Sequence, residues 1–92
     1  MAVTVRIVGD LSRFVQAHSL ELKGARYTLG SAVEELVRRN PRLGEQLFDR
    51  EGRLHYATVL ALDGCAAGWP QDRDTVIGDG AELMVTRFHS GG

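Results

Sequence analysis

The sequence has few of the residues that carry most side-chain chemistry. Its 92 residues include one lysine, Lys23, one cysteine, Cys65, and three scattered histidines. A lone cysteine cannot form an internal disulfide, which fits a reducing compartment, and it adds no ligand pair to the histidines for a structural zinc site. No glycine-rich loop is joined to the lysine, and the serines have no neighbouring base, so neither a P-loop nor a nucleophilic active site is expected.

Long apolar runs and an excess of one charge are also missing. The run ATVLAL at 57–62 is far shorter than a membrane span, and residues 1–10 show neither the basic region nor the cleavage site of a signal peptide. The formal net charge of −1 attracts neither nucleic acid nor an anionic membrane. We therefore expect a cytoplasmic protein with no nucleic-acid or membrane partner.

Some features invite a functional interpretation but also have a simpler one. The segment DRDTVIGDG at 72–80 superficially resembles a calcium loop, but Ile77 stands where the turn glycine belongs, so no metal is expected. Cys65 is interpreted as a small residue packed near a strand end, and Trp69 either as a lid over the core edge or as a partner anchor. The cluster RRNPR at 38–42 is typical of a helix C-terminus favoured by the helix dipole.

What is present indicates one α+β domain. Hydrophobic residues make up 43% of the chain and charged residues 25%, which are ordinary globular values. Apolar and polar residues alternate over about 2–8 and again over 18–23, which predicts an opening hairpin with a long connection. From Thr28 the apolar spacing becomes helical, which predicts an amphipathic helix capped by Thr28 and closed by Pro41.

The second half of the sequence predicts a short helix and two further strands. Leucines and a phenylalanine at helical spacing over 43–48 indicate the helix, and LHYATVLALDG at 54–64 is expected to be the most buried strand. The segment 65–81 is expected to be mostly turn. AELMVTRF at 81–88 predicts a last strand, followed by HSGG. The element order predicts a mixed sheet of four to five strands with the main helix on one face.

The two terminal glycines suggest a chemistry for the chain end itself. Residues 89–92 can reach about 13–14 Å beyond the last strand, and a Gly-Gly pair passes through channels too narrow for other residues. Such a tail can deliver its α-carboxylate into the active site of another protein. The simpler interpretation is a terminus that frays from the last strand.

The whole chain resembles the ubiquitin-like β-grasp sulfur carriers. The segments that carry the resemblance are YTLGSAVEELVRRNP at 27–41, VLALDG at 59–64, IGDGAELMV at 77–85 and the terminal Gly91-Gly92. The family includes the small subunit of molybdopterin synthase, the thiamine-pathway carrier and a carrier for a dedicated cysteine synthesis, and residues 47–64 look most like the last type. RFHS at 87–90 departs from relatives, which often carry proline and small apolar residues there.

This resemblance implies a role for the chain as a cosubstrate and not as an enzyme. An adenylating partner would use ATP to activate Gly92, and a sulfur donor would convert it into a thiocarboxylate that a synthase consumes. No cofactor would be bound to the chain itself. Residues 1–88 would form the β-grasp domain and 89–92 an extended tail.

The same resemblance assigns roles to the residues before Gly92. Gly91, Ser90 and His89 would lie in the partner channel, with Gly91 as the slim spacer. Phe88 and Met84 are the candidates for partner docking, and core packing is the alternative for both. Two other functions stay open: a ubiquitin-like modifier joined to target lysines through Gly92, and a β-grasp adaptor that makes no use of its tail.

Overall fold

The computed structural model describes residues 2–24 and 26–88, so the predicted tail at 89–92 lies outside the described residues. Its elements, in chain order, are β1 (Ala2–Ile7), the 3-10 helix η1 (Gly9–Phe14), β2 (Ser19–Lys23), α1 (Leu29–Arg39), α2 (Pro41–Leu47), β3 (Thr58–Leu62), β4 (Cys65–Ala67) and β5 (Glu82–Arg87). The predicted α+β architecture is therefore confirmed.

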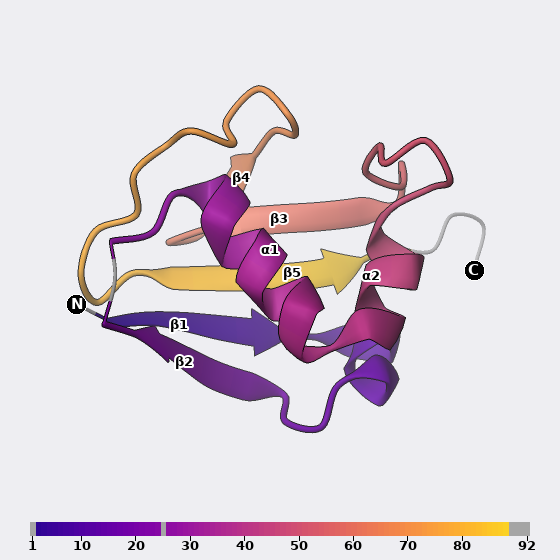
Figure 1. The fold of residues 1–92 in the computed structure, drawn as a ribbon, viewed down its shortest axis with the longest axis horizontal. Helices are drawn as coiled ribbons and strands as arrows, with labels where there is room; N and C mark the ends of the chain where they lie inside the picture. The colour runs from indigo at the N-terminus through magenta and orange to yellow at the C-terminus, as the bar shows by residue number, and fades with distance from the viewer. Residues whose placement is uncertain (1, 25, 89–92) are drawn as a thin grey trace.

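The strands form one mixed five-stranded sheet in the order β2-β1-β5-β3-β4 (Figure 1). The central strand, β5, runs parallel to its neighbour β1, with Ile7 opposite Val85, and the other neighbouring pairs are antiparallel. The predicted opening hairpin is the β1–β2 pair. Because β1 and β5 point the same way, the residues that follow them emerge at the same end of the sheet.

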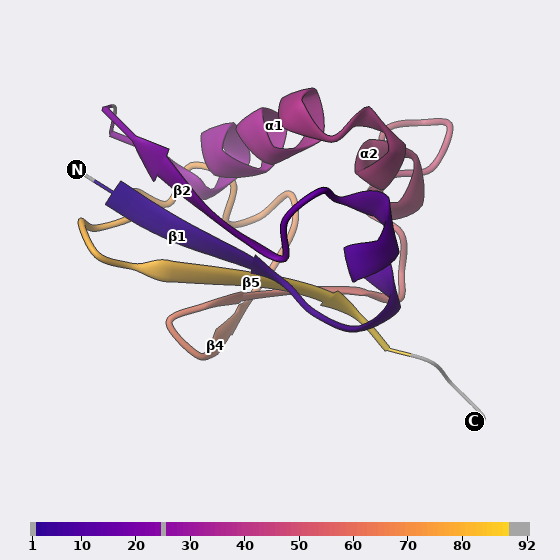
Figure 2. The ribbon, with the colours of Figure 1, turned by 90° about the horizontal axis from the view of Figure 1, so that it is seen from below.

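Both α-helices lie on one face of the sheet (Figure 2). The core fills the space between these helices and the sheet, because the buried alternate positions of β1 and β5 face the apolar stripe of α1. Val5, Leu36 and Leu83 represent these three elements, and all are fully buried. Leu83 and Val85 of β5 are buried, whereas Met84 between them is only half-buried, as the alternation of a strand requires.

The start of α1 is fixed by its own cap and by a distant loop. Thr28 and Ser31 form a capping box, in which the Ser31 amide donates to Thr28 Oγ1 (3.1 Å) and the Thr28 amide to Ser31 Oγ (2.9 Å). The two amides between them reach the distant loop: that of Leu29 donates to the Thr75 carbonyl (2.9 Å) and that of Gly30 to the Arg73 carbonyl (2.8 Å). A Cβ at Gly30 would lie 3.1 Å from that carbonyl oxygen, so glycine allows this close approach.

Three boundaries differ from the sequence prediction. The third strand begins at Thr58 instead of residue 54, because Leu54 instead makes an isolated bridge with Phe48. Residues 65–81 contain a strand, β4, which had been assigned to turn. The second helix runs from Pro41, its first residue, to Leu47, so Phe48 lies just beyond it.

The interpretation of Trp69 as a lid over the core edge agrees with its surroundings. Trp69 is partly buried against the core and meets the ring of Phe48 edge to face at 5.8 Å. Cys65 does lie at a strand end, but the prediction that it is packed there is wrong, because its side chain is exposed. Strand β4 lies at the edge of the sheet, where only one neighbour covers it.

None of the described helices is long and apolar enough to cross a membrane. No group of three or more histidine, cysteine or acidic side chains in residues 2–24 and 26–88 is placed to hold a metal ion.

Candidate functional site

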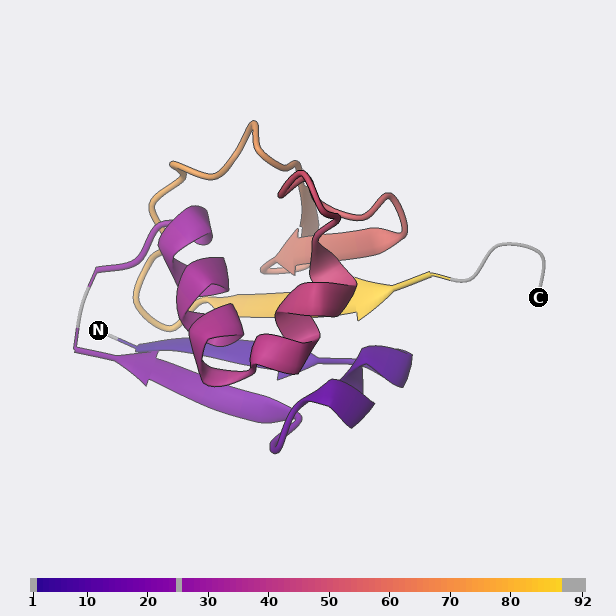
Figure 3. The ribbon, with the colours of Figure 1, turned by 45° about the vertical axis from the view of Figure 1, so that its right-hand side comes forward.

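The carboxyl end of β5 is the last part of the chain that the structure describes. Arg87 pairs with Thr58 of β3, and the Phe88 amide continues this ladder by donating to the Ala57 carbonyl (3.0 Å). In Figure 3, β5 runs out past α2 on the side of the molecule where η1 lies. The predicted tail residues therefore follow directly from a strand whose end is held in the sheet up to Phe88.

Apolar side chains are exposed at this end of the sheet. The described residues include four large hydrophobic side chains that are exposed, and three of them belong to segments at this end of the sheet: Val8 (38% exposed), Tyr56 (78%) and Phe88 (49%). Val8 follows β1, and its amide donates to the Val85 carbonyl (3.0 Å). We call Val8, Tyr56 and Phe88 the exit surface. Because isolated exposed apolar residues are common but gathered ones mark interaction sites, this clustering is informative.

The two aromatic residues of the exit surface hold each other in place. The rings of Tyr56 and Phe88 meet edge to face, with centroids 6.4 Å apart. The His55 ring stacks on Tyr56, with ring centroids 4.7 Å apart, and its Nδ1 accepts a hydrogen bond from the Ala57 amide (3.2 Å). The turn before β3 thus presents Tyr56 beside the end of β5.

An ion pair also fixes the end of β5. The guanidinium of Arg87 is bonded to the carboxylate of Asp10 in η1 and donates through its other terminal nitrogen to Gln46 Oε1 in α2 (3.2 Å). Both charged side chains are largely shielded, with 19% of Arg87 and 22% of Asp10 exposed. One residue before Phe88, three elements are therefore tied together.

The sheet face that the α-helices leave open continues from the exit surface. Met84 is half-buried on this face, with Arg6 of β1 and Ala61 of β3 as its cross-strand neighbours. Next to it, Thr86 pairs with Val59, and Thr86 Oγ1 donates to the Val8 carbonyl (3.1 Å). A strip of small and apolar side chains thus leads from Met84 toward Phe88.

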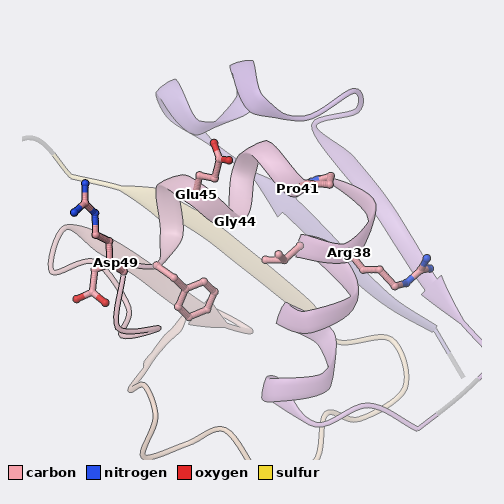
Figure 4. Close-up of a pocket in the computed structure, with 8 residues that line it drawn as sticks. Arg38, Pro41, Gly44, Glu45 and Asp49 are labelled. Carbon is pink, nitrogen blue, oxygen red and sulfur yellow. The ribbon is translucent and has the colours of Figure 1, made fainter.

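A separate groove of about 600 Å³ lies on the helical side, between α1 and α2 (Figure 4). Val37, Gly44 and Phe48 form its apolar wall, while Glu45 and Asp49 belong to its charged rim. The backbone amide of Arg53 is the main cause of a lowered pKa for Asp49, since it donates to that carboxylate at 2.9 Å. This groove contains none of the predicted site residues.

Of the predicted site residues, the structure describes Met84 and Phe88. Phe88 is exposed and Met84 half-exposed on the open face, so the alternative of full core packing does not hold for either. Gly92, Gly91, Ser90 and His89 lie outside the described residues. Tyr56, Val8 and Arg87 were not predicted, because each acquires its position through contacts with residues far away in the sequence.

Comparison with known proteins gives matches in structure alone. No protein-family model and no curated protein matches the sequence. SAMP1 from Haloferax volcanii superposes with a TM-score of 0.85 at 22% identity over 100% of both chains. The structure of the Amycolatopsis orientalis BexX/CysO complex matches with a TM-score of 0.76 at 23% identity over 98% of this chain and 99% of that chain.

A third match is the putative molybdopterin converting factor subunit 1 from Pyrococcus furiosus, with a TM-score of 0.69 at 17% identity over 94% of this chain and 95% of that chain. The chain therefore has the ubiquitin-like β-grasp fold over its whole described length. This is the fold that the resemblance implied. At these sequence identities the likeness establishes the fold alone, and a function has to rest on the residues of this chain.

Proposed function

We propose that this chain is a sulfur-carrier protein whose reactive group is the α-carboxylate of Gly92. The observation that carries the proposal is the exit surface. A strand held rigidly up to Phe88 ends among exposed apolar side chains, and the sequence continues with four residues that finish in Gly91-Gly92. A partner that covers Val8, Tyr56 and Phe88 would receive the chain end directly.

The chemistry requires an activating partner, because a carboxylate is a poor electrophile. The Gly92 carboxylate would attack the α-phosphate of ATP, forming an acyl-adenylate and releasing pyrophosphate. Sulfide would then attack the acyl carbon and displace AMP, leaving a thiocarboxylate in which sulfur replaces one oxygen. The scaffold supplies docking and presentation, and both the adenylating enzyme and the acceptor of the sulfur are separate proteins.

The proposed role of the tail follows from its side chains. Gly91 would pass the narrowest part of the partner channel because it lacks a Cβ, while Ser90 and His89 would fill the wider part nearer the exit surface. Phe88 and Met84, on the open face of the sheet, would form the docking contact together with Tyr56. Cys65 and Trp69 take no part, since β4 and its loop lie on the far side of β3 from β5.

A ubiquitin-like modifier is the second candidate. The observation that favours it is the match to a small archaeal modifier protein, SAMP1, over the full chain. In this function the activated Gly92 would be transferred to a lysine amine of a target protein, with loss of AMP. The two functions share the activation step and differ only in the nucleophile.

Intact-mass measurement after activation tests the proposal. The chain is incubated with the adenylating enzyme of its organism, ATP and sulfide, and we expect the mass gain of one oxygen-to-sulfur exchange. A variant without Gly91 and Gly92 should show no gain while keeping its thermal midpoint, because the tail contributes little to the core. Products joined to target lysines, without the sulfur exchange, would support the modifier instead. If the mass stays unchanged and no product joined to target lysines forms, only the β-grasp adaptor that makes no use of its tail would remain.

A further inference from the structure

A small pocket lined by arginines lies where η1 approaches the junction of α1 and α2. Its volume is about 240 Å³, and its lining includes the guanidinium-bearing residues Arg13, Arg39 and Arg42 but no acidic residue. Phe14 and Pro41 supply an apolar wall. We call this the arginine pocket. Positive charge is thus concentrated in one concave place on a chain whose formal net charge is −1.

Nearby carboxylates do not neutralise this charge. Glu35 is shared by two guanidiniums, accepting from Arg38 Nε (3.0 Å) and from Arg39 Nε (2.7 Å). These hydrogen bonds, led by the one from Arg38, lower the pKa of Glu35 to about 2. Among the described residues, neither Arg13 nor Arg42 forms an ion pair. Of the three arginines of the pocket, only Arg39 is paired with a described carboxylate, and it shares that carboxylate with Arg38.

Helix electrostatics accounts for only one of the three arginines of the pocket, Arg39. Arg38 and Arg39 lie in the last turn of α1, where the helix dipole favours a cation. Arg42 lies in the first turn of α2, which runs from Pro41, and a cation at that end is disfavoured by the dipole. Arg13, in η1, is brought to the same pocket from a segment more than 20 residues earlier. Arg13 and Arg42, which form no ion pair with a described residue, therefore line one pocket whose lining contains no counter-charge.

We propose that the arginine pocket binds the phosphate group of a small phosphorylated compound. Guanidinium groups present planar, paired N–H donors that match the oxygens of a phosphate, and the bonds are charge-assisted. The volume suits a compact group instead of a polymer. Nucleic acid would need basic residues along an extended surface, and the one lysine of the chain, Lys23, lies on β2, away from the pocket lining. This site does not use Gly92 and is independent of the proposed sulfur-carrier function.

Amide chemical shifts of the full chain can test this site. Inorganic phosphate, pyrophosphate and AMP are titrated separately at constant ionic strength, with sodium chloride as the balancing salt. We expect saturable shifts confined to residues 13–16 and 39–42. Arg13→Gln and Arg42→Gln should each weaken binding about tenfold. Arg26→Gln is the matched control, because Arg26 is also exposed and forms no ion pair with a described residue, and it should stay within about twofold of the native chain.

Each outcome decides something about the site. Equal affinity for phosphate and AMP would identify the phosphate alone as the ligand, while tighter AMP binding with a shift at Phe14 would identify a nucleotide. Absence of saturation with all three probes would overturn the proposal. The same holds if Arg26→Gln weakens binding as much as Arg42→Gln. A single-stranded oligonucleotide serves as the comparison probe. If only this oligonucleotide bound, with an affinity that rises with its length, the proposal would be overturned, because the result would indicate a polyanion surface.

Discussion

The guanidinium of Arg87 is bonded to the carboxylate of Asp10, although the two residues are separated by 77 positions in the chain. The pair joins the last strand to the 3-10 helix that follows the first strand, and Gln46 adds α2 as a third partner. Because Arg87 immediately precedes Phe88, this pair fixes the end of β5 at the exit surface.

Arg87→Met should lower the free energy of unfolding by about 1–3 kcal/mol, since it removes the shielded guanidinium that is bonded to the Asp10 carboxylate. Arg6→Met is the matched control, because Arg6 and Glu82 form a pair between β1 and β5 at 3.7 Å with about half of each side chain exposed. That loss should stay within about 0.5 kcal/mol. Urea denaturation measures both, and equal losses would show that shielding of the Arg87 pair has no energetic effect.

Glu35 should make stability depend on pH in the acidic range. Hydrogen bonds from Arg38 and then Arg39 lower its pKa from 4.5 to about 2. A carboxyl with a lowered folded-state pKa stabilises the fold above its unfolded pKa, and this contribution is lost as pH falls toward about 2. The thermal midpoint should therefore decline between about pH 5 and pH 2, and Glu35→Gln should flatten the decline.

The control for this pH dependence is Glu45→Gln. Glu45 is exposed and forms no ion pair with a described residue, so its replacement should leave the slope of the thermal midpoint against pH as it is in the native chain. An unchanged slope in Glu35→Gln, measured by circular dichroism over the same pH range, would contradict the role assigned to the arginine pair.

Much of the fold could be predicted because its elements carry regular patterns. Strands β1, β2 and β5 alternate clearly between apolar and polar residues, and α1 has both a cap at Thr28 and an apolar stripe. Strand β4 has three small residues, CAA, and too few positions to show a period. The strand expected over 54–64 begins too early because Leu54 and Tyr56 are apolar for other reasons. Leu54 forms an isolated bridge with Phe48, and the exposed ring of Tyr56 contacts that of Phe88.

Only the part of the candidate site that lies on a single strand could be predicted from the sequence. Once 81–88 is a strand, alternation alone places Met84 and Phe88 on the face opposite Leu83. Tyr56 joins Phe88 through the pairing of β3 with β5, and no local pattern reveals that register. The same is true of Asp10 and Arg87, whose partnership depends on the complete sheet.

Gly44→Ala should destabilise the chain even though alanine favours helices. A Cβ at this position would lie 2.6 Å from Val37 Cγ1, where α2 packs on α1 (Figure 4). We expect a loss of about 1–3 kcal/mol from overpacking, and the double variant with Val37→Ala should recover part of it. Gly78→Ala is the control, since nothing lies within 4 Å of its added Cβ. Urea denaturation that finds Gly44→Ala as stable as Gly78→Ala would show that the helices shift freely apart.

The exit surface should contribute to partner binding and little to stability. Tyr56→Ala and Phe88→Ala remove exposed rings, so each should change the free energy of unfolding by less than about 1 kcal/mol. If the surface docks the adenylating enzyme, each should raise the KM for the chain about tenfold, with kcat nearly kept, because docking energy is lost equally from the bound and transition states.

Val76→Ala separates docking from general surface effects. Val76 is 56% exposed, slightly more than Phe88 at 49%, but it pairs with Thr28 near the start of α1, outside the exit surface. The adenylating enzyme's KM for the Val76→Ala variant should therefore match its KM for the native chain. The KM of every variant is measured from the release of pyrophosphate during activation. If Tyr56→Ala and Phe88→Ala instead lowered kcat at an unchanged KM, the aromatic pair would direct the chain end after docking, because the loss would then fall on the transition state alone.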